Sequence, residues 1–311
     1  MSTFLVEVRQ IDRLEPHFNA DLLEVAYLKD LDYPIVVRKG YEVGTKVIYF
    51  PLDAVLPAEV AEHLGLKSRK IKTMKLRGQI SQGFAAPLET VAEGLDLPEN
   101  TDMTWWFGVE KEEDDFVCSG RKHTLPSYLS VYDLENCERH KHVVEQLEQL
   151  EEVLIFEKME GSNMSISFDG NFRVCSRRQE VFEGTMYEVG KKYETLVQTM
   201  FLHEPYTLRG EIVGPGIQGN IYKLKEHKFL LFDVQVGGRY LSYHEWPPIE
   251  TCPLIYRGPL KDFGDLKASA VSQFGHTLRE GIVVRSVEEK NLHRFGRAII
   301  KQRSPEYLAT H

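Results

Sequence analysis

The chain has 311 residues, of which 42% are hydrophobic and 27% charged, an ordinary globular composition that argues against disorder. No apolar run approaches the roughly 20 residues of a membrane span, and the N-terminus "MSTFLVEVRQ" carries Glu7 and Arg9, so we expect neither a membrane protein nor a signal peptide. The 38 Lys and Arg against 47 Asp and Glu give a net charge of −9, which argues against indiscriminate nucleic-acid binding and leaves that role to local patches.

The length and the cysteine pattern indicate two domains and reduced thiols. At about 100 to 200 residues per domain, two domains are expected. Cys118, Cys137, Cys175 and Cys252 are far apart and form no C-x-x-C pair, so neither a zinc site nor a disulfide framework is indicated. We expect a cytoplasmic protein, or a nuclear one in a eukaryote.

The first hundred residues predict a small β-barrel. Apolar or alternating runs are separated by Asn, Asp, Pro and Gly turns: "TFLVEVRQI", "DLLEVAYLK", "PIVVRKG", "GTKVIYFP" and "GFAAPLETV". Between the fourth and fifth runs, "PAEVAEHLGL" has helical spacing.

A basic segment follows that helix and suggests a nucleic-acid contact. It contains no acidic residue and six cations: Lys67, Arg69, Lys70, Lys72, Lys75 and Arg77. A barrel with a basic loop resembles the OB folds, partly open Greek-key barrels that bind oligonucleotides on one face. "IDRLEPHFNADLLEV" and "KLRGQISQGFAAPL" are also similar to the tRNA-binding OB domains of some synthetases. A solvated lysine-rich loop without a ligand is the alternative.

The acidic run "VEKEEDDF", residues 109 to 116, marks an exposed linker or loop and a domain boundary. After it, residues 133 to 153 predict a helix with Asp133 as its N-cap and apolar residues at helical spacing.

The stretch "IFEKMEGSNMSISF", residues 155 to 168, places Lys158 at the end of an apolar strand and before a turn at Gly161. A lysine amine attacks phosphorus only when it is unprotonated, and a free lysine with a pKa of about 10.4 is almost wholly protonated at neutral pH. Burial, nearby cations or a metal would favour the neutral amine, whereas Glu157 and Glu160 would oppose it. The local charges leave open whether Lys158 is a nucleophile or a surface residue.

The run "KMEGSN" resembles the K-x-x-G-x-N nucleotidyl-transfer motif of ATP-dependent RNA ligases, relatives of DNA ligases and mRNA capping enzymes. An ordered series of further similarities supports the resemblance. "RVCSRRQEV" resembles the second element, in which an arginine such as Arg177 binds the nucleotide or the RNA end. "YTLRGEIVGPG" resembles the third, whose carboxylate, here Glu211, contacts ribose or metal.

The series continues to the end of the chain. In "HKFLLFDVQV", Phe232 matches the aromatic residue that stacks on adenine, although a core position would explain it equally. "LREGIVVRS" resembles the fourth motif, with Glu280 as a direct or water-mediated metal ligand and Val283 closing the other face of the base. "GRAIIKQRSPEYL" resembles the fifth, in which Lys301 reaches the α-phosphate; Arg303 stands where the family often has a second lysine.

The resemblance implies an α+β protein. An N-terminal OB-fold domain over residues 1–115 would precede a nucleotidyltransferase (ATP-grasp-like ligase) domain over residues 116–311, built from two antiparallel sheets with flanking helices. Only eight residues follow Arg303, so the OB domain precedes the catalytic one, as in one branch of these ligases.

The resemblance also implies a chemistry. Lys158 would attack the α-phosphorus of ATP, AMP would pass to an RNA 5′-phosphate, and a 3′-hydroxyl would then displace the AMP. The cofactor would be Mg²⁺ or Mn²⁺. The protein would be a monomer whose partner is a nicked RNA or RNA/DNA duplex. The expected catalytic residues are Lys158, Lys301 and Arg303. The expected ATP contacts are Glu157, Gly161, Asn163, Arg177, Glu211, Phe232, Val283 and Lys301, and the expected metal ligands are Glu211 and Glu280.

Two alternatives remain open. One is a capping-type guanylyltransferase, against which the K-x-x-G-x-N form speaks. The other is a non-catalytic RNA-binding protein built on the OB domain, against which the filled nucleophile and phosphate-binding positions speak.

Overall fold

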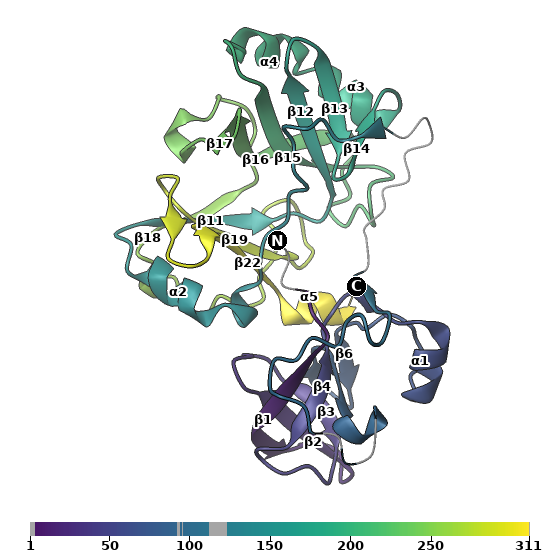
Figure 1. Ribbon diagram of the computed structural model, residues 1–311. Coiled ribbons are helices and arrows are strands. Elements are labelled where there is room, and N and C mark those ends of the chain that lie inside the picture. Colours follow the sequence, from purple (N-terminus) through teal and green to yellow (C-terminus); the bar gives the residue numbers. More distant parts are fainter. Residues whose placement is uncertain (1–3, 92–93, 95, 112–122, 311) are drawn as a thin grey trace. The chain divides into compact units, whose positions relative to one another are not determined.

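A computed structural model describes residues 4–91, 94, 96–111 and 123–310 (Figure 1). The chain divides into two compact units: Met1–Asp114 with Pro305–His311, and Asp115–Ser304. The last helix therefore groups with the first unit, whereas the sequence placed it at the end of the second domain. The expected domain boundaries, residues 1–115 and 116–311, remain a prediction. The expected acidic linker, 109–116, lies largely outside the described residues, as does Cys118.

The first unit is built on a five-stranded antiparallel sheet in the order β3-β2-β1-β4-β8. Its strands are β1 (Glu7–Pro16), β2 (Leu23–Leu28), β3 (Ile35–Arg38), β4 (Lys46–Phe50) and β8 (Phe84–Pro87), one for each run expected from the sequence. Alternate residues of β1 and β4 enter two different apolar clusters, one around Val8 and Ile48 and the other around Ile11 and Tyr49. Apolar side chains thus cover both faces of the sheet.

Short elements complete the first unit. They are α1 (Ala58–His63), α5 (Pro305–Thr310), the 3-10 turn η1 (Leu88–Thr90), the pair β5 (Ala54–Val55) with β9 (Glu110–Lys111), and the hairpin β6 (Met74–Leu76) with β7 (Gln79–Ser81). The expected helix over "PAEVAEHLGL" is α1, which begins directly after Pro57, a residue that cannot donate a helical hydrogen bond.

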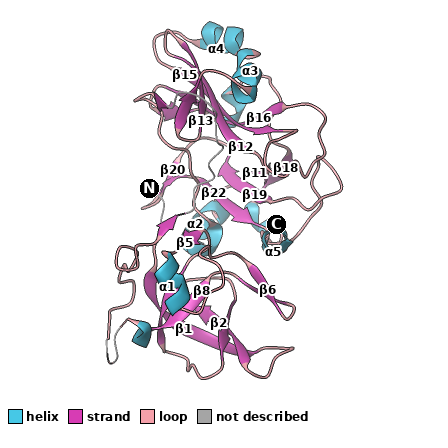
Figure 2. Ribbon diagram, turned by 90° about the vertical axis from the view of Figure 1, so that its right-hand side faces the viewer, coloured by secondary structure: helices cyan, strands magenta, loops and turns pink. Residues whose placement is uncertain are grey.

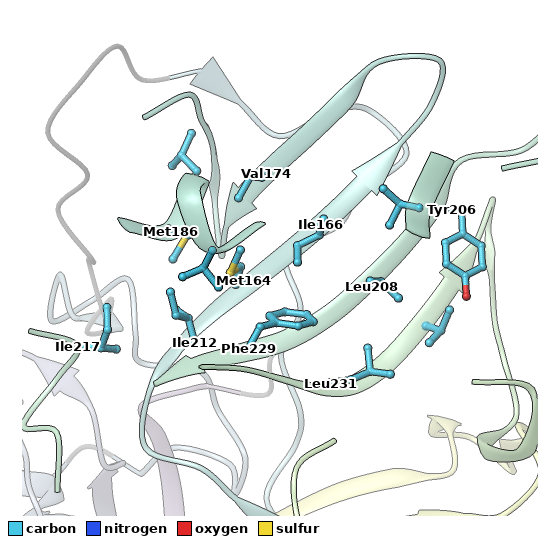
Figure 3. Close-up of a cluster of buried hydrophobic side chains, with 14 of the residues drawn as sticks. Met164, Ile166, Val174, Met186, Tyr206, Leu208, Ile212, Ile217, Phe229 and Leu231 are labelled. Atoms are coloured by element: carbon cyan, nitrogen blue, oxygen red, sulfur yellow. The ribbon is translucent and has the colours of Figure 1, made fainter. Parts of the chain in front are cut away.

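The second unit contains a seven-stranded antiparallel sheet, in the order β10-β14-β13-β12-β15-β16-β17. Its strands are β10 (His123–Thr124), β12 (Ser162–Phe168), β13 (Phe172–Ser176), β14 (Gln179–Val181), β15 (Tyr206–Val213), β16 (Lys228–Val236) and β17 (Arg239–Tyr240). Helices α3 (Thr185–Lys191) and α4 (Glu194–Met200) pack on one face (Figure 2). Figure 3 shows the apolar cluster between these helices and the sheet, in which Met164, Leu208 and Phe229 are fully buried.

A second sheet of this unit has the order β18-β11-β19-β22. Its strands are β11 (Val153–Lys158), β18 (Leu254–Gly258), β19 (Gly281–Ser286) and β22 (Ile299–Arg303), and a hairpin of β20 (Asn291–Leu292) and β21 (Gly296–Arg297) lies between the last two in sequence. Short turns η2 (Cys137–Arg139), η3 (Tyr243–Glu245) and η4 (Leu260–Asp262) and helix α2 (Lys141–Glu148) complete the unit.

The two faces of this smaller sheet have different neighbours. One face, with Ile155 and Val284, packs against α2. The other, with Leu154 and Phe156, shares an apolar cluster with Leu230 of β16, a strand of the seven-stranded sheet. This last cluster joins the two sheets, and it is the region in which the candidate site lies.

The prediction of a helix over residues 133–153 is wrong in its extent. Helix α2 begins at Lys141, and Asp133 caps no helix. Before it, Asn136 forms a parallel bridge with Lys301, and the Lys301 amide donates to the carbonyl of Glu135 at 2.9 Å. Because this segment pairs with β22, its backbone is extended and unavailable to a helix.

Among the described residues, no helix is long and apolar enough to cross a membrane. Cys137, Cys175 and Cys252 are buried free thiols, and burial raises the pKa of Cys137 and Cys175 to about 12, so these thiols are poor metal ligands. In the described part of the chain, no group of three or more His, Cys, Asp or Glu side chains could hold a metal ion.

Candidate active site

Lys158 is the last residue of β11, as the sequence predicts, and its neighbours across the sheet are Gly281 of β19 and, beyond it, Arg303 of β22. Two residues along these strands, Val283 pairs with Phe156 on one side and with Lys301 on the other. Paired residues on neighbouring strands, and residues two apart on one strand, share a face of the sheet. The register therefore puts the side chains of Lys158, Val283, Lys301 and Arg303 on one face.

Position 281 has no room for a side chain. A Cβ built on Gly281 would lie 2.1 Å from the carbonyl oxygen of Gln302, far inside van der Waals contact. Glycine thus permits β19 and β22 to pair closely between Lys158 and Arg303.

The amine of Lys158 is paired with Glu280. Its Nζ lies 2.5 Å from Glu280 Oε1, and the two side chains are 25% and 13% exposed. The carboxylate balances the charge of the lysine. The structure thus brings together two of the residues that the sequence singled out.

The side chain of Glu157 does not join this group. Side chains alternate along a strand, so Glu157 lies on the face opposite Lys158. It is 1% exposed, and its carboxylate accepts hydrogen bonds from Ser272 Oγ at 2.5 Å and the Gln273 amide at 2.9 Å. These bonds fix the loop at residues 272–273 against β11.

The facing wall is formed by β12 and β15. Asn163 and Glu211 are direct register partners there, and both are partly buried. Gly161, in the turn after Lys158, lies so close to β15 that a Cβ would be 2.5 Å from the carbonyl oxygen of Ile212 and 2.7 Å from Glu211 Cγ. The glycine of the K-x-x-G pattern is therefore required because it lets this turn approach β15.

A second contact holds the same turn. The Glu160 amide donates to the hydroxyl of Tyr222 at 2.6 Å, and Tyr222 is 5% exposed. Burial raises the pKa of Tyr222, so the phenol stays neutral. Sequence patterns gave no sign of this tyrosine.

Phe232 stands at a β-bulge. Arg209 of β15 pairs with Asp233 and the next residue, Gly210, pairs with Leu231, which leaves Phe232 without a register partner. A bulge redirects the side chains of the strand. Leu231 lies in the cluster with α3 and α4, whereas Phe232 packs into the cluster between the sheets, where Phe156 also lies. Since Phe156 pairs with Val283, Phe232 and Val283 border the same region from different sheets.

Two expected ATP contacts, Lys301 and Arg177, pair with one carboxylate. Asp133 Oδ1 lies 3.2 Å from Lys301 Nζ, and its Oδ2 lies 3.1 Å from Arg177 Nη2. The side chains of Lys301 and Arg177 are 21% and 24% exposed. Asp133, which the sequence placed at the N-cap of a helix, instead pairs with two cations that the sequence singled out and that come from different sheets.

A buried ionic cluster lies beside Phe232. Asp233 is fully buried, and its carboxylate is 3.2 Å from Arg285 Nη1 and 2.8 Å from Arg297 Nη1. Burial alone would raise the pKa of Asp233, but the two guanidinium groups hold it below its ordinary value. Arg285 also donates to the carbonyl oxygen of Phe232 at 3.3 Å, and the Tyr132 ring packs on Phe232 with centroids 4.9 Å apart.

This cluster fixes the walls that flank Phe232. Asp233 follows Phe232 directly on β16, and Arg285 follows Val283 by two residues on β19. The pair Asp233–Arg285 thus ties the two sheets together next to both side chains. Sequence reasoning missed it, although a carboxylate in "FLLFDVQV" and a guanidinium in "GIVVRS" are the signal: charges within apolar strands need a buried partner.

The basic segment lies in the first unit. Arg69 donates from Nε to the carbonyl oxygen of Leu56 at 2.8 Å, and Lys70 forms a bridge with Val55, so this part of the segment runs along β5. The other four cations are exposed and form no ion pair within the described part of the chain: Lys67, Lys72, Lys75 and Arg77.

Comparisons with known proteins agree with this architecture. Residues 151–303 match the RNA ligase family, and residues 5–88 match an OB-fold domain family. No curated protein sequence matches the chain.

Among solved structures, the chain is similar to variants of Naegleria gruberi RNA ligase with ATP and Mn and with AMP and Mn, each at a TM-score of 0.81. It is also similar to the same ligase with pyrophosphate, at a TM-score of 0.80. Sequence identity is 23% in each case; the alignments cover 99% of this chain and, in that order, 99%, 98% and 98% of the ligase. At this identity the likeness establishes a shared fold.

The expected fold is confirmed: an N-terminal OB-fold domain and a ligase domain of antiparallel sheets. Residues 151–303 thus form a domain of the RNA ligase family, and an OB-fold domain precedes it in the sequence.

Proposed function

We propose that this protein is an ATP-dependent RNA ligase that joins a 3′-hydroxyl to a 5′-phosphate through lysyl-AMP and RNA-adenylate intermediates. The observation that carries the proposal is the shared sheet face of Lys158, Lys301 and Arg303, with Glu280 at 2.5 Å from the lysine amine. A nucleophile beside phosphate-binding cations is what transfer of a nucleotide to lysine needs.

In the first step, the neutral amine of Lys158 attacks the α-phosphorus of ATP, the bond to pyrophosphate breaks, and a phosphoramidate forms. The lysine must first lose a proton, and the Glu280 carboxylate is adjacent to accept it. Lys301, Arg303 and Arg177 would offset the charge on the phosphates. Arginine in place of lysine at 303 keeps the charge and offers a forked donor.

The base and sugar would occupy the region between the sheets. Phe232 and Val283 border it from opposite sides, in agreement with a stacked adenine. Asn163 and Glu211, side by side on β12 and β15, offer an amide and a carboxylate to the ribose or to a metal ion.

Glu211 and Glu280 fit a divalent ion of the Mg²⁺ type. Such an ion is commonly held by one or two carboxylates together with substrate phosphates and waters, which suits a site without a larger cluster of ligands in the described residues. When bound, Mg²⁺ or Mn²⁺ would neutralise charge on the phosphates.

The later steps use the same site. AMP would pass from Lys158 to the 5′-phosphate of RNA, and the 3′-hydroxyl of the adjoining strand would attack that phosphate and release AMP. We propose nicked duplexes with RNA on the 3′-hydroxyl side as substrates of a monomeric, cytoplasmic or nuclear enzyme. The exposed cations of residues 67–77 would contact the nucleic-acid backbone.

Labelling of the protein tests the first step. Protein incubated with α-labelled ATP and a divalent cation should retain label on a denaturing gel, and Lys158→Ala should abolish it. Lys158→Arg should also abolish it, since arginine keeps the charge but is not a nucleophile. Lys228→Ala is the control, because Lys228 forms an ordinary exposed pair with Glu250. Label retained from GTP alone would instead indicate a guanylyltransferase, and label retained by Lys158→Ala would refute the assigned nucleophile.

Sealing assays test the substrate. Matched nicks that differ in a ribose or deoxyribose at the 3′-hydroxyl end should be sealed at different rates, with RNA preferred, because the 2′-hydroxyl is what distinguishes the two. Equal rates would refute the proposed preference and leave the adenylation result untouched.

A further inference from the structure

An exposed aromatic ring in the first unit lies against the tip of the basic hairpin β6–β7. Phe18, in the turn between β1 and β2, is 70% exposed. Its ring lies so close to Gly78 that a Cβ there would be 2.8 Å from Phe18 Cζ. Gly78 and Arg77 form the two-residue turn of the hairpin, with φ of +96° and +48°, as in a type I′ turn.

Polar contacts hold this ring in place. The buried His17 stacks on Phe18, with ring centroids 5.3 Å apart and planes 13° from parallel. His17 Nδ1 accepts from the Asn19 amide at 3.0 Å, so its Nε2–H donates to the carbonyl oxygen of Leu76 at 3.1 Å. Asn19 donates from its side chain to the carbonyl oxygen of Arg77 at 3.3 Å. The β1–β2 turn and the hairpin are thus fixed to each other, and the ring is preorganised.

The hairpin beside the ring is cationic. Its Lys75 and Arg77 are exposed, and neither forms an ion pair with any residue that the structure describes. The β1–β2 turn contributes one carboxylate, Asp21. A rigid, open aromatic face beside two unpaired cations matches a nucleotide, whose base stacks while its phosphate pairs with the cations.

Another exposed aromatic residue of the same unit lacks this setting. Trp105 is 92% exposed, and residues 102–110 around it contain Asp102 and Glu110 and no lysine or arginine. Exposure of the ring is therefore not what distinguishes Phe18 from Trp105; the neighbouring cations are.

We propose that Phe18 is a stacking platform for an unpaired nucleobase in a single-stranded segment that adjoins the nicked duplex, with Lys75 and Arg77 on its phosphates. The inference rests on the proposed function and specifies how the OB-fold domain takes part. Because stacking uses the base and not the sugar, RNA and DNA strands should bind this site about equally well.

Fluorescence anisotropy with a short labelled single strand tests the proposal on the full-length chain. Phe18→Ala should weaken binding about 5- to 150-fold. Phe18→Trp should retain most of the affinity, whereas Phe18→Leu, which keeps an apolar contact with Gly78, should bind as weakly as alanine. Trp105→Ala should bind like the wild type.

The salt dependence tests the cations. Lys75→Ala and Arg77→Asn should each lower the slope of log affinity against log salt by about 0.7, one phosphate contact of a single strand. Asparagine is chosen because it tolerates the positive φ at position 77. Quenching of 2-aminopurine in the bound strand, lost in Phe18→Ala and kept in Phe18→Trp, would locate the stacked base.

Equal affinities of wild type and Phe18→Ala would overturn the proposal, as would a Trp105→Ala defect of the same size or equal binding by Phe18→Leu and the wild type. Adenylation of Lys158 serves as the independent readout, and Phe18→Ala should leave it unchanged. If the wild type takes no label from ATP, the proposed function fails while the binding comparison still decides the stacking site. If it takes label and Phe18→Ala binds normally, the stacking site alone fails.

Discussion

Replacement of Arg285 by methionine should destabilise the ligase domain strongly. Arg285 is 1% exposed and pairs with the fully buried Asp233. Removal of one partner of a buried pair costs about 3–5 kcal/mol, because the remaining charge is left without its counter-charge. Asp233 keeps Arg297 at 2.8 Å and the Tyr132 hydroxyl at 2.7 Å. We therefore expect the lower end of the range, about 3 kcal/mol.

A double-mutant cycle separates this pairing from lost packing. Asp233→Asn and Arg285→Met should each destabilise the domain, but the double variant should cost less than their sum, because neither charge is then buried opposite an empty position. The walls that flank Phe232 are held by the same pair, so Arg285→Met should also raise the KM for ATP in the adenylation assay more than it lowers kcat.

Trp246 offers a local probe for this cycle. Arg285 lies 4.9 Å from its ring centroid, and the other two tryptophans of the chain, Trp105 and Trp106, are exposed residues of the first unit. With both replaced by phenylalanine, urea unfolding followed by Trp246 fluorescence reports on the second unit. A cost below about 1 kcal/mol for Arg285→Met, or strict additivity in the double variant, would refute the reasoning.

Three further predictions concern the same domain. Asp133→Asn should bind pyrophosphate about 2- to 30-fold more tightly by calorimetry, because two partly exposed ion pairs no longer compete with it; weaker binding would show that the carboxylate is needed to position the cations. The pKa of Asp233 is lowered in the folded state, so its contribution to stability is present above the unfolded pKa of about 3.9 and is lost as the pH falls through the folded pKa. The urea midpoint should therefore fall more steeply with acid in the wild type than in Asp233→Asn. Gly281→Ala should cost at least about 1–3 kcal/mol in urea unfolding, whereas Gly238→Ala, whose Cβ would meet nothing within 4 Å, should be silent; equal costs would refute the steric argument.

Much of the fold follows from local patterns in the sequence. The five apolar runs of the first unit became the five strands of one sheet, and the run before Lys158 became a strand that ends on it. The order of the motifs also predicted the RNA ligase family. These features depend on alternation, turns and residue order, which a single sequence displays directly.

The alternation of side chains along a strand argues against an ATP contact by the side chain of Glu157, and a contact by its backbone stays a prediction. Glu157 and Lys158 are consecutive in a strand, so their side chains point to opposite faces. A strand that presents Lys158 to the nucleotide therefore turns the Glu157 side chain away from it. The two hydrogen bonds of Glu157 to residues 272–273 show a structural role that strand periodicity allows.

Other features depend on pairing between distant segments and could not be predicted. The bulge at Phe232 arises from the register of β16 on β15, and "FLLFDVQV" carries no sign of an extra residue. The role of Asp133 depends on the pairing of residues 135–136 with β22, some 165 residues later, which prevents the expected helix. Register and long-range pairing are set by tertiary packing, which overrides local propensity.

The ion pairs of the site suggest how it accepts a nucleotide. Glu280 holds Lys158, and Asp133 holds both Lys301 and Arg177. These cations must be kept close together before any phosphate arrives, and carboxylates of the protein limit their mutual repulsion. Phosphate oxygens have the same charge and hydrogen-bonding capacity as these carboxylates, so binding exchanges one set of ion pairs for another. Such an exchange limits the net gain on binding, which would suit the release of pyrophosphate and then AMP in the proposed reaction.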